Sequence, residues 1–165
     1  RMGKKIILST GMSTIEEIDH AVDILKEKEI FFTLLHCNST YPAPKDGLNL
    51  NNIKMLSERY GVSVGYSGHE SDLEPSVIAC VLGASIIERH ITLDHEMWGT
   101  DQKASLEVHA MDLLGKRLQE INIILGSKEK TVTERTVREK SVRGERIGFT
   151  TFGSLLLWDL SPQKS

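Results

Sequence analysis

The stretch VSVGYSGHESDLEPSVIACVLGASIIERH, residues 62–90, decides the fold. It begins with a short strand over Val62–Tyr66 and continues into residues 73–81, whose apolar side chains recur at helical spacing. Gly83 ends this helix, and Ser85–His90 forms a second strand. A strand, a helix and a second strand in direct succession predict a βαβ unit with parallel strands.

The same alternation extends from this unit in both directions along the chain. Toward the N-terminus lie two strands, Ile6–Leu8 and Phe31–Cys37, each followed by a helix. The first helix is expected to start at Ser13, because Ser13-Thr14-Ile15-Glu16 has the pattern of a capping box. The second is expected over Asn49–Tyr60, and a last helix over Glu107–Leu125 follows a long loop. The chain therefore contains about four successive βα units.

Two architectures accommodate such units, an open doubly wound sheet and a (β/α)8 barrel. No Gly-x-Gly-x-x-Gly follows any of the strands, which removes the main reason to prefer a dinucleotide-binding sheet. A barrel normally needs about 250 residues, and the chain has 165. We therefore predict an α/β fold, a partial (β/α)8 TIM barrel, and expect a chain that enters a strand soon after Arg1 to begin inside that barrel. Residues 128–165, a charged stretch and an apolar tail without clear period, stay unassigned.

Composition excludes several classes of protein. With 39% hydrophobic and 26% charged residues, the chain is typical of a globular protein. A net charge of -3 gives no basic surface for nucleic acid, and no apolar run approaches the roughly 20 residues that cross a membrane. Cys37 and Cys80 lie far apart, so we expect reduced thiols in a cytoplasmic protein.

Polar residues follow each predicted strand, where parallel α/β proteins build their sites. Because side chains in a strand alternate between faces, Ser67 and His69 share one face, as do Glu88 and His90, while Arg89 points away. An imidazole on each of two neighbouring strands fits a two-histidine metal site that Glu88 orients or supplements. The alternative is that both histidines are hydrogen-bonded residues at the rim of the core.

Other candidates carry less weight. His36 alternates with Cys37 at the end of its strand, so its side chain is expected on the other face, between strand and helix. Cys37 is expected to be a small buried residue rather than a nucleophile. The segment Trp98-Gly99-Thr100-Asp101 fits either a lid with an acid at its tip or simple loop packing. Three further histidines are expected on the surface, namely His20, His95 and His109.

At these residues the chain closely resembles the sialic acid synthase family, the phosphoenolpyruvate-dependent synthases of N-acetylneuraminate and related nonulosonic acids. The similarity follows the family's order over residues 1–127. It is carried by five segments, Ile6-Ile7-Leu8-Ser9-Thr10-Gly11-Met12, Leu34-Leu35-His36-Cys37-(x)3-Tyr41-Pro42-Ala43-Pro44, Gly65-Tyr66-Ser67-Gly68-His69-Glu70, Glu88-Arg89-His90-Ile91-Thr92-Leu93-Asp94 and Trp98-Gly99-Thr100-Asp101-(x)3-Ser105-Leu106-Glu107.

The resemblance implies that residues 1–127 are the second half of a synthase barrel. It also implies that His69 and His90 bind a divalent metal, Mn²⁺ or Mg²⁺, with Glu88 beside the metal and the reacting carbons. Ser9, Ser39 and Ser67 would contact phosphoenolpyruvate. Tyr41 and Asp101 would bind the acceptor sugar.

The implied reaction condenses phosphoenolpyruvate with an N-acylated hexosamine, such as N-acetylmannosamine, to a sialic acid or related nonulosonic acid plus phosphate. The metal would polarise the sugar aldehyde, and the full-length parent would be a homodimer. The family's phosphate-binding lysines and antifreeze-like domain match no segment here, so we expect the chain alone to be inactive. Two alternatives stay open, a synthase of the same family for legionaminic acid or spore-coat polysaccharide, and a non-catalytic half-barrel that only self-associates or binds metal.

Overall fold

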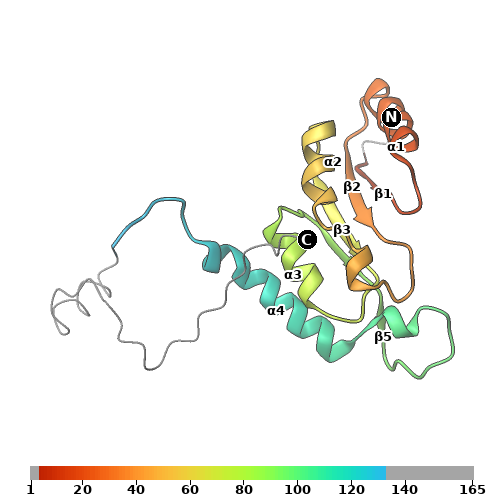
Figure 1. Ribbon diagram of the computed structural model, residues 1–165, viewed down its shortest axis with the longest axis vertical. Helices are drawn as coiled ribbons and strands as arrows, with labels where there is room; N and C mark the ends of the chain where they lie inside the picture. Colours follow the sequence, from red (N-terminus) through yellow and green to blue (C-terminus); the bar gives the residue numbers. More distant parts are fainter. Residues whose placement is uncertain (1–3, 133–165) are drawn as a thin grey trace, which may run out of the picture. The chain divides into compact units, whose positions relative to one another are not determined.

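A four-stranded parallel sheet forms the centre of the protein, as the computed structural model shows for residues 4–132 (Figure 1). The strands are β1 (Ile6–Ser9), β2 (Phe32–Cys37), β3 (Val64–Gly68) and β4 (Ile87–Arg89). They lie in chain order, and all three neighbouring pairs are parallel. The sheet confirms the predicted succession of parallel βα units.

The helices are α1 (Ile15–Glu27), α2 (Asn52–Tyr60), α3 (Glu74–Val81) and α4 (Val108–Leu125). Helix α2 packs on β2 and β3, and α3 packs on β3, β4 and α4 (Figure 1). The start predicted for the second helix, at Asn49, is wrong by three residues. Asn49 has a left-handed φ of 45°, which no α-helix accommodates, and a short 3-10 turn at Lys45–Gly47 precedes it.

The capping box of α1 lies one residue later than predicted. The Thr14 hydroxyl accepts from the Glu17 backbone N–H at 3.3 Å, and the Glu17 carboxylate accepts from the Thr14 N–H at 2.8 Å. The sequence offers two overlapping boxes, because two hydroxyl residues precede two glutamates. Ser13 is not the cap because its hydroxyl donates to the Gly11 carbonyl.

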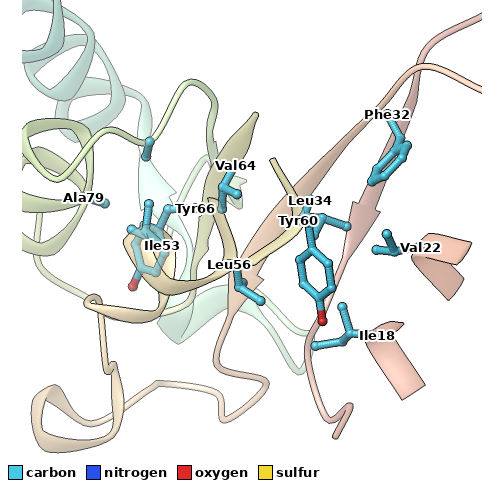
Figure 2. Close-up of a cluster of buried hydrophobic side chains, with 11 residues drawn as sticks. Ile18, Val22, Phe32, Leu34, Ile53, Leu56, Tyr60, Val64, Tyr66 and Ala79 are labelled. Carbon is cyan, nitrogen blue, oxygen red and sulfur yellow. The ribbon is translucent and has the colours of Figure 1, made fainter. Parts of the chain in front are cut away.

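The core lies between the sheet and its helices. Leu34 and Tyr66, from the two central strands, are fully buried at 0% exposure. Figure 2 shows side chains of α1 and α2 converging on them. The buried cluster consists of Ile18, Val22, Phe32, Leu34, Ile53, Leu56, Tyr60, Val64, Tyr66, Ala79 and Ala84. Because all four strands are parallel, their carboxyl ends lie at the same edge of the sheet.

The loop after β4 is framed by a small parallel pair that the sequence did not predict. β5 (Ile91–Thr92) pairs with β6 (Leu106–Glu107), and a short 3-10 turn covers Gln102–Ala104. The sequence predicts only a long loop here, with the last helix starting at Glu107, whereas Glu107 ends β6 and α4 starts at Val108. Two-residue strands carry no alternation by which a sequence could reveal them.

The first compact unit of the chain ends at Gly126, which is also the C-cap of α4. A second unit begins at Ser127, and of it the structure describes residues 127–132. Most of the unassigned segment 128–165 therefore lies outside the described residues. Within residues 4–132, no helix combines the length and apolarity needed to span a bilayer.

Candidate functional site

Three rings converge where β2, β3 and β4 end. The centroids of Tyr41 and His69 lie 4.2 Å apart, those of His69 and His90 5.1 Å, and those of Tyr41 and His90 5.9 Å. They come from segments far apart in sequence, the loops after β2 and β3 and the residue after β4. The structure thus brings both predicted metal ligands and one predicted sugar-binding residue together.

Strand register explains why the two histidines are neighbours. Ser67 pairs with Glu88 and Gly68 pairs with Arg89 across β3 and β4, so the next residues along both strands are His69 and His90. The environments of the two rings differ. His69 is 4% exposed, whereas the side chain of His90 is 37% exposed.

Hydrogen bonds fix the tautomer of His69. Its Nδ1 lies 2.8 Å from the carbonyl oxygen of Asn38, which can only accept, so Nδ1 carries the proton. Nε2 then accepts from the Tyr41 hydroxyl at 3.1 Å. A backbone bond from Ala43 N–H to the His69 carbonyl, at 3.0 Å, also holds the loop after β2 against β3.

Ser67 and Glu88, each predicted on the same face as its strand's histidine, form a hydrogen-bonded pair. The Ser67 hydroxyl is buried and donates to Glu88 Oε1 at 2.7 Å. Glu88 itself is exposed. Its carboxylate is therefore oriented from one side and accessible from the other.

Asp101 approaches the site from the loop between β5 and β6. Its Oδ2 lies 3.9 Å from His90 Nδ1, and its side chain is 48% exposed. Partial burial raises the pKa of Tyr41, and the neighbouring Cys37, Asp101 and Glu88 groups raise it further. Tyr41 therefore keeps its proton and can act as a hydrogen-bond donor.

Of the remaining two predicted substrate residues, Ser9 lies apart from this cluster and Ser39 borders it through Cys37. Ser9 ends β1, pairs with Leu35 and is exposed, and no hydrogen bond within residues 4–132 joins its side chain to another candidate. The Ser39 hydroxyl lies 3.7 Å from the Cys37 sulfur. Gly11 allows this arrangement, because a Cβ there would collide with the Ser39 hydroxyl.

The residues given less weight lie largely where expected. His36 is buried on the helix side, with Nε2 2.7 Å from the Leu48 carbonyl, and burial lowers its pKa. Cys37 is half-buried rather than fully buried, because its sulfur lies at the site, 3.7 Å from His69 Nδ1. The three histidines expected on the surface are exposed, namely His20, His95 and His109.

Two imidazoles are the groups here that can hold a metal. Among the described residues, no group of three or more histidine, cysteine, aspartate or glutamate side chains has metal-binding geometry. The chemistry of His69 nevertheless fits a metal ligand. A ligating histidine usually donates its other ring N–H to a carbonyl or carboxylate, as Nδ1 does to Asn38. A metal on Nε2 would replace the bond from Tyr41.

The sequence did not predict the partner of Arg89. Its side chain points away from the histidine face, as expected, and forms an ion pair with Glu70. The Arg89 side chain is 1% exposed and the Glu70 side chain 2%. The one sign in the sequence of a buried partner was the positive charge of Arg89 itself. A charged side chain that turns toward the helices packed on its strand needs an opposite charge nearby.

A polar site at the carboxyl ends of a parallel half-barrel is the arrangement typical of (β/α)8 proteins. The NeuB family model matches residues 1–130. The chain belongs to the NeuB family.

Individual relatives agree with this assignment. Over 129 residues the chain is 41% identical to the N,N'-diacetyllegionaminic acid synthase of Campylobacter jejuni, covering 76% of this chain and 39% of the relative. It is 34% identical to the human N-acetylneuraminate-9-phosphate synthase over 131 residues, covering 79% and 36%. The chain thus spans well under half the length of these relatives.

The solved structures confirm the partial (β/α)8 barrel. The crystal structure of N-acetylneuraminic acid (sialic acid) synthetase from Leptospira borgpetersenii, in complex with citrate, superposes with a TM-score of 0.75 at 35% identity. The match covers 87% of this chain and 50% of that one. A putative spore coat polysaccharide biosynthesis protein E from Chromobacterium violaceum gives a TM-score of 0.72 at 30% identity.

Proposed function

We propose that this chain supplies one part of the active site of a synthase that joins phosphoenolpyruvate to an N-acylated hexosamine. The products are a sialic acid or related nonulosonic acid and inorganic phosphate. One observation carries the proposal: in a NeuB-family chain, His69, His90 and Tyr41 lie together at the carboxyl edge of the sheet.

His69 and His90 are the proposed ligands of a divalent metal, Mn²⁺ or Mg²⁺. The fixed tautomer of His69 supports this role, because it leaves a lone pair on Nε2. When bound, the metal supplies a Lewis acid that polarises the aldehyde of the acceptor sugar. Water and substrate would complete its coordination.

Glu88 and Ser67 are proposed to act on the phosphoenolpyruvate half of the reaction. Carbon 3 of phosphoenolpyruvate forms a bond to the aldehyde carbon, water adds at carbon 2, and phosphate leaves. Glu88 takes a proton from that water, since its carboxylate is exposed and lies on the same strand face as His90. Ser67 has one hydroxyl proton, so contact with an anionic substrate oxygen would exchange its bond to Glu88 for a bond to the substrate.

Tyr41 and Asp101 are the proposed contacts of the acceptor sugar, with Ser9 and Ser39 assigned to phosphoenolpyruvate. The tyrosine donates a hydrogen bond, and the carboxylate accepts from sugar hydroxyls. N-acetylmannosamine is one acceptor. The 41% identity to a diacetyllegionaminic acid synthase favours a diacetylated hexosamine as the second candidate.

The complete reaction needs groups that these residues do not provide, above all cations for the phosphate. We propose that they come from the other half of the barrel and that the complete enzyme is a homodimer. The reaction is assigned to the cytoplasm. Support for this compartment comes from the two cysteines, Cys37 and Cys80, which are both free thiols.

A chimaera tests the proposal. Residues 1–130 would replace the matching segment of the Leptospira synthetase, and phosphate release would be measured with phosphoenolpyruvate, metal and either N-acetylmannosamine or its diacetylated counterpart. We expect release that depends on metal and acceptor and is lost when His69 and His90 are both replaced by alanine. The preferred acceptor identifies the sugar.

Ser57→Ala provides the matched control, because its hydroxyl lies on α2 and, within residues 4–132, bonds only to the Val62 carbonyl. This chimaera should retain its activity. A folded chimaera that binds metal but releases no phosphate would contradict the synthase assignment and favour the non-catalytic half-barrel.

A further inference from the structure

A buried ion pair lies on the helix side of the sheet, directly behind the candidate site. Arg89 Nη1 and Glu70 Oε1 are 2.9 Å apart, and the two side chains are 1% and 2% exposed. Each partner is covalently adjacent to one imidazole of the site: Glu70 follows His69, and Arg89 precedes His90. The pair therefore joins the same two chain segments that carry the histidines.

The guanidinium and carboxylate belong to a wider network. Glu70 accepts from the Tyr66 hydroxyl at 2.8 Å and from the Ser76 hydroxyl at 3.4 Å. Arg89 Nη1 also donates to the Asp72 carbonyl and to the Ser76 hydroxyl, both at 3.0 Å, and Nη2 donates to the Glu70 carbonyl. The Arg89 side chain of β4 thus contacts Glu70 and Asp72 in the segment after β3, and Ser76 in the first turn of α3.

We propose that the Glu70–Arg89 pair is a positioning device that sets the separation of His69 and His90. The proposal rests on the proposed function only in treating the two imidazoles as the metal-binding pair. A shift of β4 along β3 would change the distance between the rings. Such a shift has to break the bonds that Arg89 makes to Glu70, Asp72 and Ser76, so the network opposes it.

A purely structural ion pair predicts different behaviour. Replacing a buried pair with apolar side chains of similar volume is often neutral or stabilising, whereas removing one partner strands a buried charge. If Glu70 and Arg89 served stability alone, an apolar pair could replace them without consequence for the site. If they position the histidines, an apolar pair keeps the fold and loses the spacing, because apolar contacts lack direction.

The test uses the full chain with Glu70→Leu and Arg89→Met combined. The control combines Asp19→Leu and Arg59→Met, which removes a partly exposed ion pair of 2.6 Å between α1 and α2, away from the site. Urea unfolding shows which proteins are folded. NMR of the metal-free chain measures the nuclear Overhauser effect between the ring protons of His69 and His90, and Co²⁺ titration measures metal affinity.

We expect the folded Glu70→Leu/Arg89→Met variant to lose the His69–His90 signal and to bind Co²⁺ at least about tenfold more weakly. The control should keep both. Arg89→Lys serves as a second variant, because it keeps the charge but not the planar fork. It should weaken Co²⁺ binding severalfold, even if the double variant fails to fold.

Three results separate this proposal from the proposed function. Folded variants that keep the ring signal and the Co²⁺ affinity would overturn the positioning role, and so would a wild-type chain without the ring signal. A wild-type chain that shows the ring signal but binds no Co²⁺ would overturn the metal site. In that case the loss of the signal in the variants would still establish the positioning role.

Discussion

The two sides of the candidate site are built differently. On the β2–β3 side, His69 and Ser67 are 4% and 3% exposed, and both have short hydrogen bonds within the chain. On the side of β4 and the following loop, the side chains of His90 and Asp101 are 37% and 48% exposed. The distance between His90 Nδ1 and Asp101 Oδ2 is 3.9 Å. The first side is closed, and the second is open.

This difference indicates how the site is assembled. The closed side is oriented by the core before any ligand arrives, which lowers the cost of ordering it on binding. The open side has few internal contacts, so its geometry depends more on what it binds. Mutations should therefore affect stability on the closed side and mainly ligand binding on the open side.

The largest difference should come from leucines of the two regions. Leu34→Ala on β2 removes a side chain with 0% exposure, and we expect a loss of about 2–5 kcal/mol in the free energy of unfolding. Leu93→Ala, at 79% exposure in the open loop, should change it by less than about 0.5 kcal/mol. Urea unfolding measures both, and equal losses would remove the distinction between the regions.

Tyrosine hydroxyls should show the next largest difference. Tyr66→Phe takes a buried donor from the Glu70 carboxylate, which should cost about 1.5–3 kcal/mol of stability. Tyr41→Phe removes a hydroxyl from a ring that is 43% exposed, and stability should change by less than about 0.5 kcal/mol. Thermal and urea unfolding would decide. A larger effect at Tyr41 would show that the loop after β2 is structural.

Two glycines contrast the tightly packed strand β3 with the uncrowded helix α4 through opposite signs. A Cβ at Gly65 on β3 would lie 2.6 Å from the Ile86 carbonyl oxygen, so Gly65→Ala should destabilise the chain by about 1–3 kcal/mol. A Cβ at Gly115 within α4 would meet nothing within 4 Å. Gly115→Ala should stabilise by about 0.5–1 kcal/mol, because alanine favours helix. Stabilisation by both substitutions would contradict the close packing of β3 and β4.

The sequence predicted most of what decides the fold. Apolar runs bounded by glycine marked the strands, and strand parity placed Ser67 on the face of His69 and Glu88 on the face of His90. These features follow from local periodicity, which a single sequence contains. The family resemblance added Tyr41 and Asp101, whose approach to the histidines no local pattern could indicate.

What the sequence missed depends on contacts distant in the chain or on choices between equivalent residues. Glu70 is one of several acids that could neutralise Arg89, and only the packing of α3 against β3 selects it. Ser13 and Thr14 are equally suitable caps until the Gly11 carbonyl engages one of them. Asn49 fits a helical pattern but has a left-handed backbone.

The smallest expected effect is a dependence of stability on pH at His36. Burial lowers the pKa of His36 below its ordinary value of 6.5, so the unfolded chain takes up a proton first as the pH falls. The stabilisation is complete above that ordinary value and is lost as the pH falls toward the folded pKa. Urea midpoints at pH about 7.5 and about 5.5 should therefore differ more in wild type than in His36→Gln. Equal differences would contradict a buried neutral imidazole.

The most direct test of the central claim is Mn²⁺ binding by the full chain, followed by electron paramagnetic resonance. We predict that wild type binds Mn²⁺ and that replacing His69 and His90 together by alanine weakens binding by more than about 100-fold while the chain stays folded. The Ser57→Ala control should bind like wild type. Equal Mn²⁺ affinity in the wild type and the double histidine variant would show that the two imidazoles are rim residues and not a metal site.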